Sequence, residues 1–255
     1  AEADMIGTAA GIASTGKIPF ASTFAHFAAG RAFDQIRNSV VYPKLNVKIC
    51  PTHAGISLGE DGGSHQSVED MALMRSLPGM VVLSPADAVE TEKMIFAVAE
   101  YEGPVYVRLG RLNIPVLFDE NYKFEIGKAH TLTEGNDVAI IATGLMVYEA
   151  AEAAKLLEKE GIKARVINMS TIKPLDEETV LKAAKECKFI VTSEEHSVVG
   201  GLGSAVSEYL SEVHPTKVIK HGIYDVFGQS ADGETMLNNY NLRAKDIAEL
   251  VLKNK

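Results

Sequence analysis

Apolar and polar positions follow two rhythms that alternate along the chain. Short apolar runs, such as Val138–Ala142, are followed by longer stretches in which apolar residues recur every three or four positions, as in Val68, Met71 and Met74. Short runs are typical of buried strands, and the longer spacing is typical of amphipathic helices. Strands that alternate with helices predict βαβ units, so we expect an α/β fold of mostly parallel sheets flanked by helices.

The alternation gives a set of expected elements and one interruption. We expect strands at 18–21, 47–50, 81–83, 105–107, 138–142, 164–167, 189–192 and 218–219. We expect helices at 1–15, 23–39, 67–76, 88–101, 144–160, 176–187, 201–213 and 242–253. The polar stretch 118–136 interrupts the pattern and predicts a linker or a short strand pair. Two domains are therefore expected, residues 1–118 and 136–255, joined by a linker over 119–135.

Composition and charge exclude several classes of protein. Hydrophobic residues make up 46% of the chain and charged residues 23%, the usual range for globular proteins. The net charge of −9, with no Lys/Arg cluster, argues against nucleic acid and anionic membranes as partners. No apolar run approaches the roughly 20 residues that a membrane helix requires. Cys50 and Cys187 stand far apart in the sequence, so we expect no disulfide framework, no zinc site and a cytoplasmic location.

The segment Thr52–Gln66 concentrates the candidate chemistry. It follows an expected strand and precedes an expected helix, which is where parallel sheets bind ligands. It holds His53, His65, Glu60 and Asp61 among several glycines. Histidine moves protons near neutral pH, and glycine lets the backbone approach a ligand closely. Two other interpretations stay open: a flexible surface loop, or a metal site of His53, Asp61 and His65, although that spacing matches no standard zinc pattern.

This segment resembles the transketolase loop Thr-His-Asp/Ala-x-Ile-x-x-Gly-Glu-Asp-Gly-x-Thr/Ser-His-Gln. Other parts of the chain resemble the same family: Glu2–Met5, Ser22–Phe27, Pro85–Asp87, Arg111 with Pro115 four residues later, and residues 136–206 with Glu194-Glu195-His196 and Gly200-Gly201-Leu202-Gly203. The resemblance covers nearly the whole chain. It implies a pyrimidine-binding domain over 1–118 and a transketolase C-terminal-like domain over 136–255.

The resemblance further implies that thiamine diphosphate is the cofactor and that three residues meet its aminopyrimidine ring. Glu2 matches the glutamate that bonds to N1′ of the ring, where a carboxyl favours the imino form that takes the proton from thiazolium C2. Phe24 and Phe27 match the aromatic residues around the ring, with Phe27 as the stacking side chain. Without the resemblance, Glu2 would be interpreted as a surface acid, and the two phenylalanines as core residues.

Four polar residues match positions that contact the sugar substrates. His65, with His53, suits the removal and return of protons on the substrate, and His65 is expected to be catalytic. Asp61 matches a residue that bonds a substrate hydroxyl. Arg111 matches a phosphate-binding arginine, because a guanidinium can bind phosphate through two parallel hydrogen bonds. Arg108 is close enough in the sequence to compete with Arg111 for that role.

The reaction implied by the resemblance is transfer of a two-carbon ketol unit from a ketose phosphate to an aldose phosphate, as in the pentose phosphate pathway. Transketolases hold Mg²⁺ and the diphosphate with a Gly-Asp-Gly motif, which this sequence lacks. Glu2, which matches the catalytic glutamate, is already the second residue, so we expect the first strand and helix of the first domain to be missing. It resembles the second subunit of a split enzyme. The partner subunit would carry Gly-Asp-Gly and the Mg²⁺, with a homodimer of this chain inside a heterotetramer.

Three alternatives are weighed against this hypothesis. Two are enzymes of the same superfamily, a 1-deoxyxylulose-5-phosphate synthase and a 2-oxo acid dehydrogenase beta subunit. The loop Gly-Glu-Asp-Gly-Gly-Ser-His argues against both of them. The third is a non-catalytic chain that only supports assembly, and the presence of Glu2, His53, Asp61 and His65 argues against it.

Two other features are predicted to be structural. Gly201-Leu202-Gly203 precedes a helix but lacks the third glycine and the downstream acid of a dinucleotide site, so it predicts close packing of helix and strand. His130, His214 and His221 are predicted to be surface residues.

Overall fold

The first half of the chain folds around a sheet of very short strands. The computed structural model describes all 255 residues. The strand order of this first sheet is β1-β2-β4-β3-β8. Four strands are parallel, β1 (Phe20–Ala21), β2 (Lys48–Ile49), β3 (Val81–Leu83) and β4 (Val105–Val107). The fifth, β8 (Thr171–Lys173), comes from the second half of the chain and pairs with β3 in the antiparallel sense.

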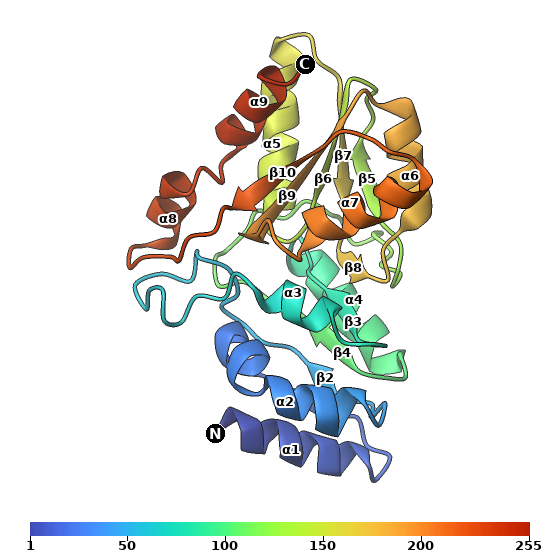
Figure 1. Cartoon of the computed structure of the whole chain (residues 1–255), viewed down its shortest axis with the longest axis vertical. Helices are drawn as coiled ribbons and strands as arrows, with labels where there is room; N and C mark the ends of the chain where they lie inside the picture. The colour runs from blue at the N-terminus through green and yellow to red at the C-terminus, as the bar shows by residue number, and fades with distance from the viewer.

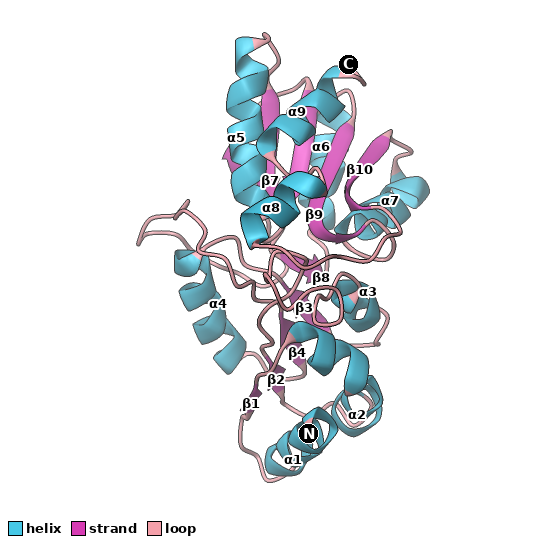
Figure 2. Ribbon diagram, turned by 90° about the vertical axis from the view of Figure 1, so that its left-hand side faces the viewer, coloured by secondary structure: helices cyan, strands magenta, loops and turns pink.

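Helices cover both faces of the first sheet, because alternate residues of a strand point to opposite sides (Figure 2). Val82 and Tyr106 pack toward the side of α1 (Glu2–Ala13) and α3 (Asp70–Arg75). Leu83 packs on the other side, against α4 (Ala88–Glu100). The carboxyl ends of the parallel strands therefore open between two helical layers, where loops can meet.

The helix expected over 23–39 is real but irregular. It runs as η1 (His26–Arg31), α2 (Phe33–Gln35) and η2 (Ile36–Val41). In the two η segments the turns are wider than in an α-helix, since Ala32 N donates to Phe27 O at 3.2 Å and Tyr42 N to Arg37 O at 2.9 Å. Wide turns of this kind are frequent at functional sites.

The second half of the chain forms the second sheet, with strand order β10-β9-β6-β7-β5. Its strands are β5 (His130–Thr133), β6 (Val138–Ala142), β7 (Ala164–Asn168), β9 (Ile190–Ser197) and β10 (Val218–Ile223). All pair in parallel except β5, which is antiparallel to β7. Its helices are α5 (Met146–Lys159), α6 (Glu177–Glu186), α7 (Leu202–Val213), α8 (Gly233–Asn239) and α9 (Ala244–Leu252).

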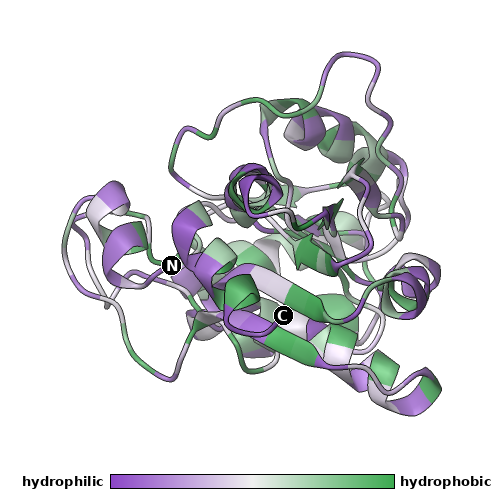
Figure 3. Ribbon diagram, turned by 90° about the horizontal axis from the view of Figure 1, so that it is seen from above, coloured by the Kyte–Doolittle hydropathy of each residue, from purple (hydrophilic) through white to green (hydrophobic).

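The two halves share an apolar core and stack one above the other (Figure 1). Met74 of α3, Ile141 of β6 and Ile172 of β8 belong to one continuous cluster of buried residues. Seen from above, hydrophobic residues concentrate in the central strands (Figure 3). The second half is therefore packed firmly on the first, and its residues can support loops of the first sheet.

The expected α/β fold of mostly parallel, helix-flanked sheets is confirmed. Three elements were not foreseen as such. The strand β5 lies inside the polar stretch that was expected to be a linker or a short strand pair, but it pairs with β7 and not with a strand of the same stretch; β8 and α8 are too short for a hydrophobic period to reveal them. None of the helices combines the length and the hydropathy that crossing a membrane requires.

Candidate active site

The predicted site residues lie on loops that follow three neighbouring strands. Phe24 comes after β1, His53 after β2, and Arg111 after β4, and these strands are adjacent in the order β1-β2-β4. The loops are joined through the backbone, since Ala25 N donates to Thr52 O at 2.8 Å and Ala54 N donates to Leu109 O at 3.1 Å. The carboxyl edge of the first sheet thus brings together residues that are far apart in the sequence.

Four rings form a continuous aromatic wall at this edge. The Phe24 ring is stacked on the His53 ring at 3.9 Å between centroids, and it is nearly parallel to the Phe27 ring, 6.0 Å away. The His65 ring meets Phe27 edge-on at 5.2 Å and Phe24 at 6.3 Å. Phe24 and Phe27 are only half-buried, so they line a surface rather than fill the core.

The side chain of Glu2 lies beside this wall and is held by Arg31. The Arg31 Nη1 donates to Glu2 Oε2 at 2.9 Å, and the guanidinium carbon stands 4.4 Å above the centroid of the Phe27 ring. A hydrogen bond from the backbone of Glu2 itself, and then the bond from Arg31, lower the pKa of the Glu2 carboxyl. The wide turn η1 carries both Phe27 and Arg31. Glu2 is therefore a fixed carboxylate at the rim of an aromatic surface.

At the opposite end of the wall, His53 lies near two charged side chains. Its backbone adopts a left-handed conformation with φ of 61°, and its Nδ1 lies 2.8 Å from Thr52 Oγ1. Desolvation, followed by the nearby Arg111, lowers the pKa of His53, and Asp61 opposes this effect. The His53 imidazole is thus favoured in its neutral form at neutral pH and can accept a proton.

Asp61 lies on the segment Thr52–Gln66, called the signature loop from here on, and Arg111 lies on the neighbouring loop after β4; both side chains face solvent. Their Nη1 and Oδ2 atoms are 3.8 Å apart, and 45% of each side chain is exposed. Arg111 also donates to the carbonyl of Leu58. The guanidinium is held by the loop yet keeps an exposed face, so it can bind an anionic group arriving from solution.

Arg108, the sequence competitor of Arg111, occupies a different environment. It is 6% exposed, its Nε donates to Asp70 Oδ2 at 2.9 Å, and its Nη2 donates to Glu195 O at 3.0 Å. Tyr106 donates its hydroxyl to the same Asp70 carboxylate at 2.9 Å. The positive charge of Arg108 is paired with Asp70 inside the protein. Arg111, which is partly exposed, is therefore the arginine that a phosphate could reach.

His53, Asp61 and His65 do not converge on a common point that could hold a metal ion. No group of three or more His, Cys, Asp or Glu residues in the chain has such an arrangement. The arrangement therefore gives no support to the metal-site interpretation of the loop, and its histidines are better suited to proton transfer and hydrogen bonding.

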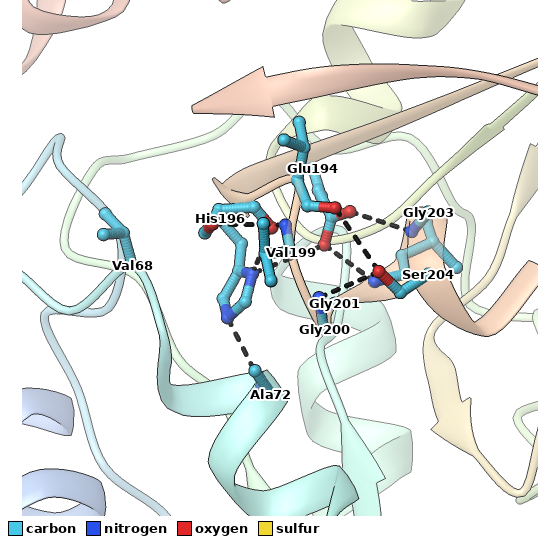
Figure 4. A network of polar contacts seen from close by, with 12 residues as sticks. Val68, Ala72, Glu194, His196, Val199, Gly200, Gly201, Gly203 and Ser204 are labelled. Carbon is cyan, nitrogen blue, oxygen red and sulfur yellow. Dashed lines mark hydrogen bonds and ion pairs between the residues drawn. The ribbon is translucent and has the colours of Figure 1, made fainter. Parts of the chain in front are cut away.

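Glu194 and His196 on β9 have structural contacts that the sequence did not reveal (Figure 4). Glu194 accepts from Leu202 N at 2.7 Å and Gly203 N at 2.8 Å, so its carboxylate occupies the start of α7. A Cβ at position 201 would stand 2.0 Å from Glu194 Oε2. The prediction that these glycines serve close packing is confirmed.

Two further residues hold the backbone of the signature loop. Glu195 reaches it from the second half of the chain, and Gln66 belongs to the loop itself. Glu195 Oε1 accepts from Ile56 N and Ser57 N, and Gln66 Nε2 donates to Ile56 O and Gln229 O. Sequence reasoning missed both, and it missed Arg31. A signal existed for Arg31, which lies four residues after Phe27 in an expected helix; Glu195 was marked only as part of the Glu194-Glu195-His196 segment, which gave no indication of a contact with the loop.

The prediction that His221 is a surface residue is wrong. It is 6% exposed, its Nδ1 lies 2.9 Å from Ser193 Oγ and its Nε2 lies 2.8 Å from Asn241 O. Desolvation lowers its pKa. The chain segment after β10 folds back across this histidine, a contact that no local pattern announces.

Two family comparisons cover nearly the whole chain. Residues 1–116 match the family described as "Transketolase, pyrimidine binding domain", and residues 127–247 match "Transketolase, C-terminal domain". The second match begins before β5, which places that strand with the second sheet, as the structure does.

Individual relatives agree with these matches. A Methanocaldococcus jannaschii protein named as a transketolase C-terminal section is 50% identical over 256 residues, which cover 99% of this chain and 80% of that protein. The 6-deoxy-6-sulfo-D-fructose transketolase subunit SqwH of a Clostridium species is 44% identical over 247 residues, 97% of this chain and 77% of that protein.

A solved structure described as "Split gene transketolase, inactive beta4 tetramer" superposes with a TM-score of 0.91 at 53% identity. The superposition covers 99% of this chain and 81% of that one.

Proposed function

The chain belongs to the transketolase family, a class of transferases, and from this premise we propose that it is one subunit of a split, thiamine diphosphate-dependent transketolase. It would provide the pyrimidine-binding domain over 1–118 and the C-terminal domain over 136–255. The reaction is transfer of a two-carbon ketol unit from a ketose phosphate to an aldose phosphate in the pentose phosphate pathway. Split-subunit relatives and the structural neighbour support this arrangement.

The observation that carries the proposal is the sandwich of Glu2, Arg31 and Phe27. The guanidinium of Arg31 is a flat, nitrogen-rich group. It lies over the Phe27 ring and donates a hydrogen bond to the Glu2 carboxylate. An aminopyrimidine ring would make these two contacts, a stack and a carboxylate–nitrogen bond. The residues present therefore fit the cofactor, and Arg31, with a side chain 59% exposed, has room to move aside.

The roles of the remaining residues follow from their positions. The cofactor, when bound, supplies the carbon nucleophile that accepts the ketol unit. Glu2 holds N1′ of its ring, and Phe24 and Phe27 exclude water from that ring. His65 and the neutral His53 hold or move the proton of a substrate hydroxyl.

Two charged side chains complete the substrate site. Asp61 bonds a substrate hydroxyl, and Arg111 binds the phosphate of the sugar. The diphosphate and Mg²⁺ are assigned to a partner subunit with a Gly-Asp-Gly motif. A chain with a net charge of −9 repels the anionic diphosphate, and without such a motif it lacks the residues that hold the diphosphate and Mg²⁺ in this family.

Reconstitution tests this proposal directly. The purified chain should show no ketol transfer from a ketose phosphate to an aldose phosphate, whereas its mixture with a Gly-Asp-Gly subunit, thiamine diphosphate and Mg²⁺ should. Calorimetry should find weak binding of the cofactor to the chain alone and tight, Mg²⁺-dependent binding to the mixture. Tight Mg²⁺-dependent binding to the isolated chain, or a mixture that binds the cofactor but transfers nothing, would count against the proposal.

Arg111→Ala should weaken the use of phosphorylated sugars selectively. Losing a charged hydrogen bond to phosphate costs about 1.5–3 kcal/mol, so KM for a sugar phosphate should rise by about tenfold or more. KM for the unphosphorylated sugar should change little. Steady-state kinetics on both substrates give the comparison, with Arg37→Ala as the matched control, because the Arg37 side chain is exposed and bonds only Asn38. An equal rise for both sugars would move the phosphate site elsewhere.

A further inference from the structure

Glu195 is a buried carboxylate that reaches from the second sheet into the signature loop of the first. It lies on β9, is 3% exposed, and its Oε1 accepts from Ile56 N at 2.8 Å and Ser57 N at 2.7 Å. Desolvation raises its pKa, while Arg108 and the two amides oppose that effect. Burying a carboxylate is costly unless hydrogen bonds and neighbouring charges compensate it, so this contact is a specific one.

The loop has been shaped to receive this carboxylate. Gly55, next to Ile56, has φ of 85°, and a Cβ there would stand 2.2 Å from Glu195 Oε1. Only glycine adopts that conformation readily and leaves the space open. The backbone of Gly55 and the Glu195 side chain therefore require one another.

The contact lies at the base of the loop that carries both histidines. Gly55 and Ser67 exchange backbone hydrogen bonds at 2.8 and 3.3 Å, which closes the loop. His53 precedes Gly55 by two residues, and His65 precedes Ser67 by two. Glu195 holds Ile56 and Ser57 next to the Gly55–Ser67 closure. The closure in turn sets the direction in which the His53 and His65 side chains extend toward Phe24 and Phe27.

Gln66 gives the loop base its second anchor. Its Nε2 donates to Ile56 O at 3.0 Å and to Gln229 O at 2.9 Å, so Ile56 is held through its amide by β9 and through its carbonyl by Gln66. Both anchors connect to the second half of the chain, one through Glu195 and the other through Gln229. The loop backbone is thus tied to a domain that contributes none of the residues assigned to the cofactor or the substrate.

We propose that Glu195 is a positioning residue for ketol transfer, which fixes the loop base so that His53 and His65 stand against the aromatic wall. The inference rests on the proposed function, and it gives the C-terminal domain a role in the active site. What matters is the reach of the acceptor oxygen to two amides rather than its negative charge.

Two conservative variants separate reach from charge. Glu195→Asp keeps the charge but shortens the arm by one methylene group, whereas Glu195→Gln keeps the length and an acceptor oxygen but removes the charge. The matched control is Glu194→Asp, which shortens the neighbouring buried carboxylate that contacts α7 and not the loop.

The first measurement is amide exchange on the isolated chain, which needs neither partner nor activity. Exchange at Ile56 and Ser57 should accelerate by about tenfold or more in Glu195→Asp, because a lost acceptor opens the loop locally. It should stay near the wild-type rate in Glu195→Gln and in Glu194→Asp. Unchanged exchange in Glu195→Asp would overturn the anchoring of the loop.

The second measurement is kinetics of the reconstituted enzyme. Glu195→Asp should lower kcat by about tenfold or more with a smaller change in KM, since misplaced histidines impair chemistry more than binding. Glu195→Gln should recover kcat to within about threefold of wild type. Equal losses in Glu195→Gln and Glu195→Asp, or a Glu195→Asp that behaves as Glu194→Asp, would overturn the proposal. A wild-type mixture without turnover would instead defeat the proposed function, and the exchange data would still decide whether Glu195 anchors the loop.

Discussion

Glu2→Gln is expected to lower kcat of the reconstituted enzyme by about 10²–10⁴-fold, the range that positioned acid–base groups contribute. An amide is isosteric with the carboxylate but carries no negative charge, so it cannot favour the protonated ring nitrogen. The fold should be intact. The Glu2–Arg31 pair is at the surface, with the Arg31 side chain 59% exposed, and exposed pairs contribute little to stability.

Exchange of the thiazolium C2 proton with deuterium is the measurement closest to this role. In the reconstituted enzyme, Glu2→Gln should slow that exchange in parallel with kcat. The matched control is Asp4→Asn, an exposed acid on the same helix that removes the same charge without touching Phe27 or Arg31. Rapid C2 exchange in the Glu2→Gln enzyme would overturn the assignment of Glu2 to the ring nitrogen.

Arg108→Ala is expected to lower the free energy of unfolding by about 3–5 kcal/mol, the usual cost of removing one partner of a buried ion pair. Asp70 would keep only the Tyr106 hydroxyl, the carbonyl of Ser67 would keep only its bond from Gly55 N, and the carbonyl of Glu195 would lose the donor that Arg108 provides. Because these carbonyls border the signature loop, the loss should also loosen the loop.

Urea unfolding of the isolated chain measures this effect. The comparison is Arg111→Ala, whose side chain is 45% exposed and should change stability by no more than about 1 kcal/mol. The two arginines are three residues apart, so the pair separates a structural arginine from the one proposed to bind the phosphate of the substrate. An Arg108→Ala chain as stable as wild type, with reduced preference for phosphorylated sugars, would reverse the two roles.

Local sequence patterns predicted the fold class and the bounds of several strands correctly. The apolar runs at Val81–Leu83, Val105–Val107 and Val138–Ala142 are strands with the predicted bounds, and each run ends before a polar residue, Ser84, Arg108 or Thr143. The first loop of the site was also a candidate, since Thr52–Gln66 packs histidines, acids and glycines into one short segment, and the family resemblance then favoured it over a flexible surface loop. Functional residues that are close together in the sequence can be identified from the sequence itself.

Local patterns failed where an element is short or depends on its surroundings. The strand β8 pairs with β3 of the first sheet although β8 comes from the second half of the chain. Its three residues are too few to display a hydrophobic period. The linker stretch 119–135 supplies β5 because the edge of β7 was open to pair with it. His221 looked like a surface residue because nothing nearby in the sequence indicates the segment that covers it.

The sequence by itself therefore determined the α/β architecture, the signature loop and the list of candidate side chains. Only the tertiary structure decided which arginine is free, Arg108 being paired with Asp70 and Arg111 facing solvent. It also brought Glu195 under Ile56 across 139 positions of the chain. The physical reason is that burial, charge pairing and hydrogen-bond satisfaction are properties of contacts in space, whereas hydrophobic periodicity is a property of neighbours along the chain.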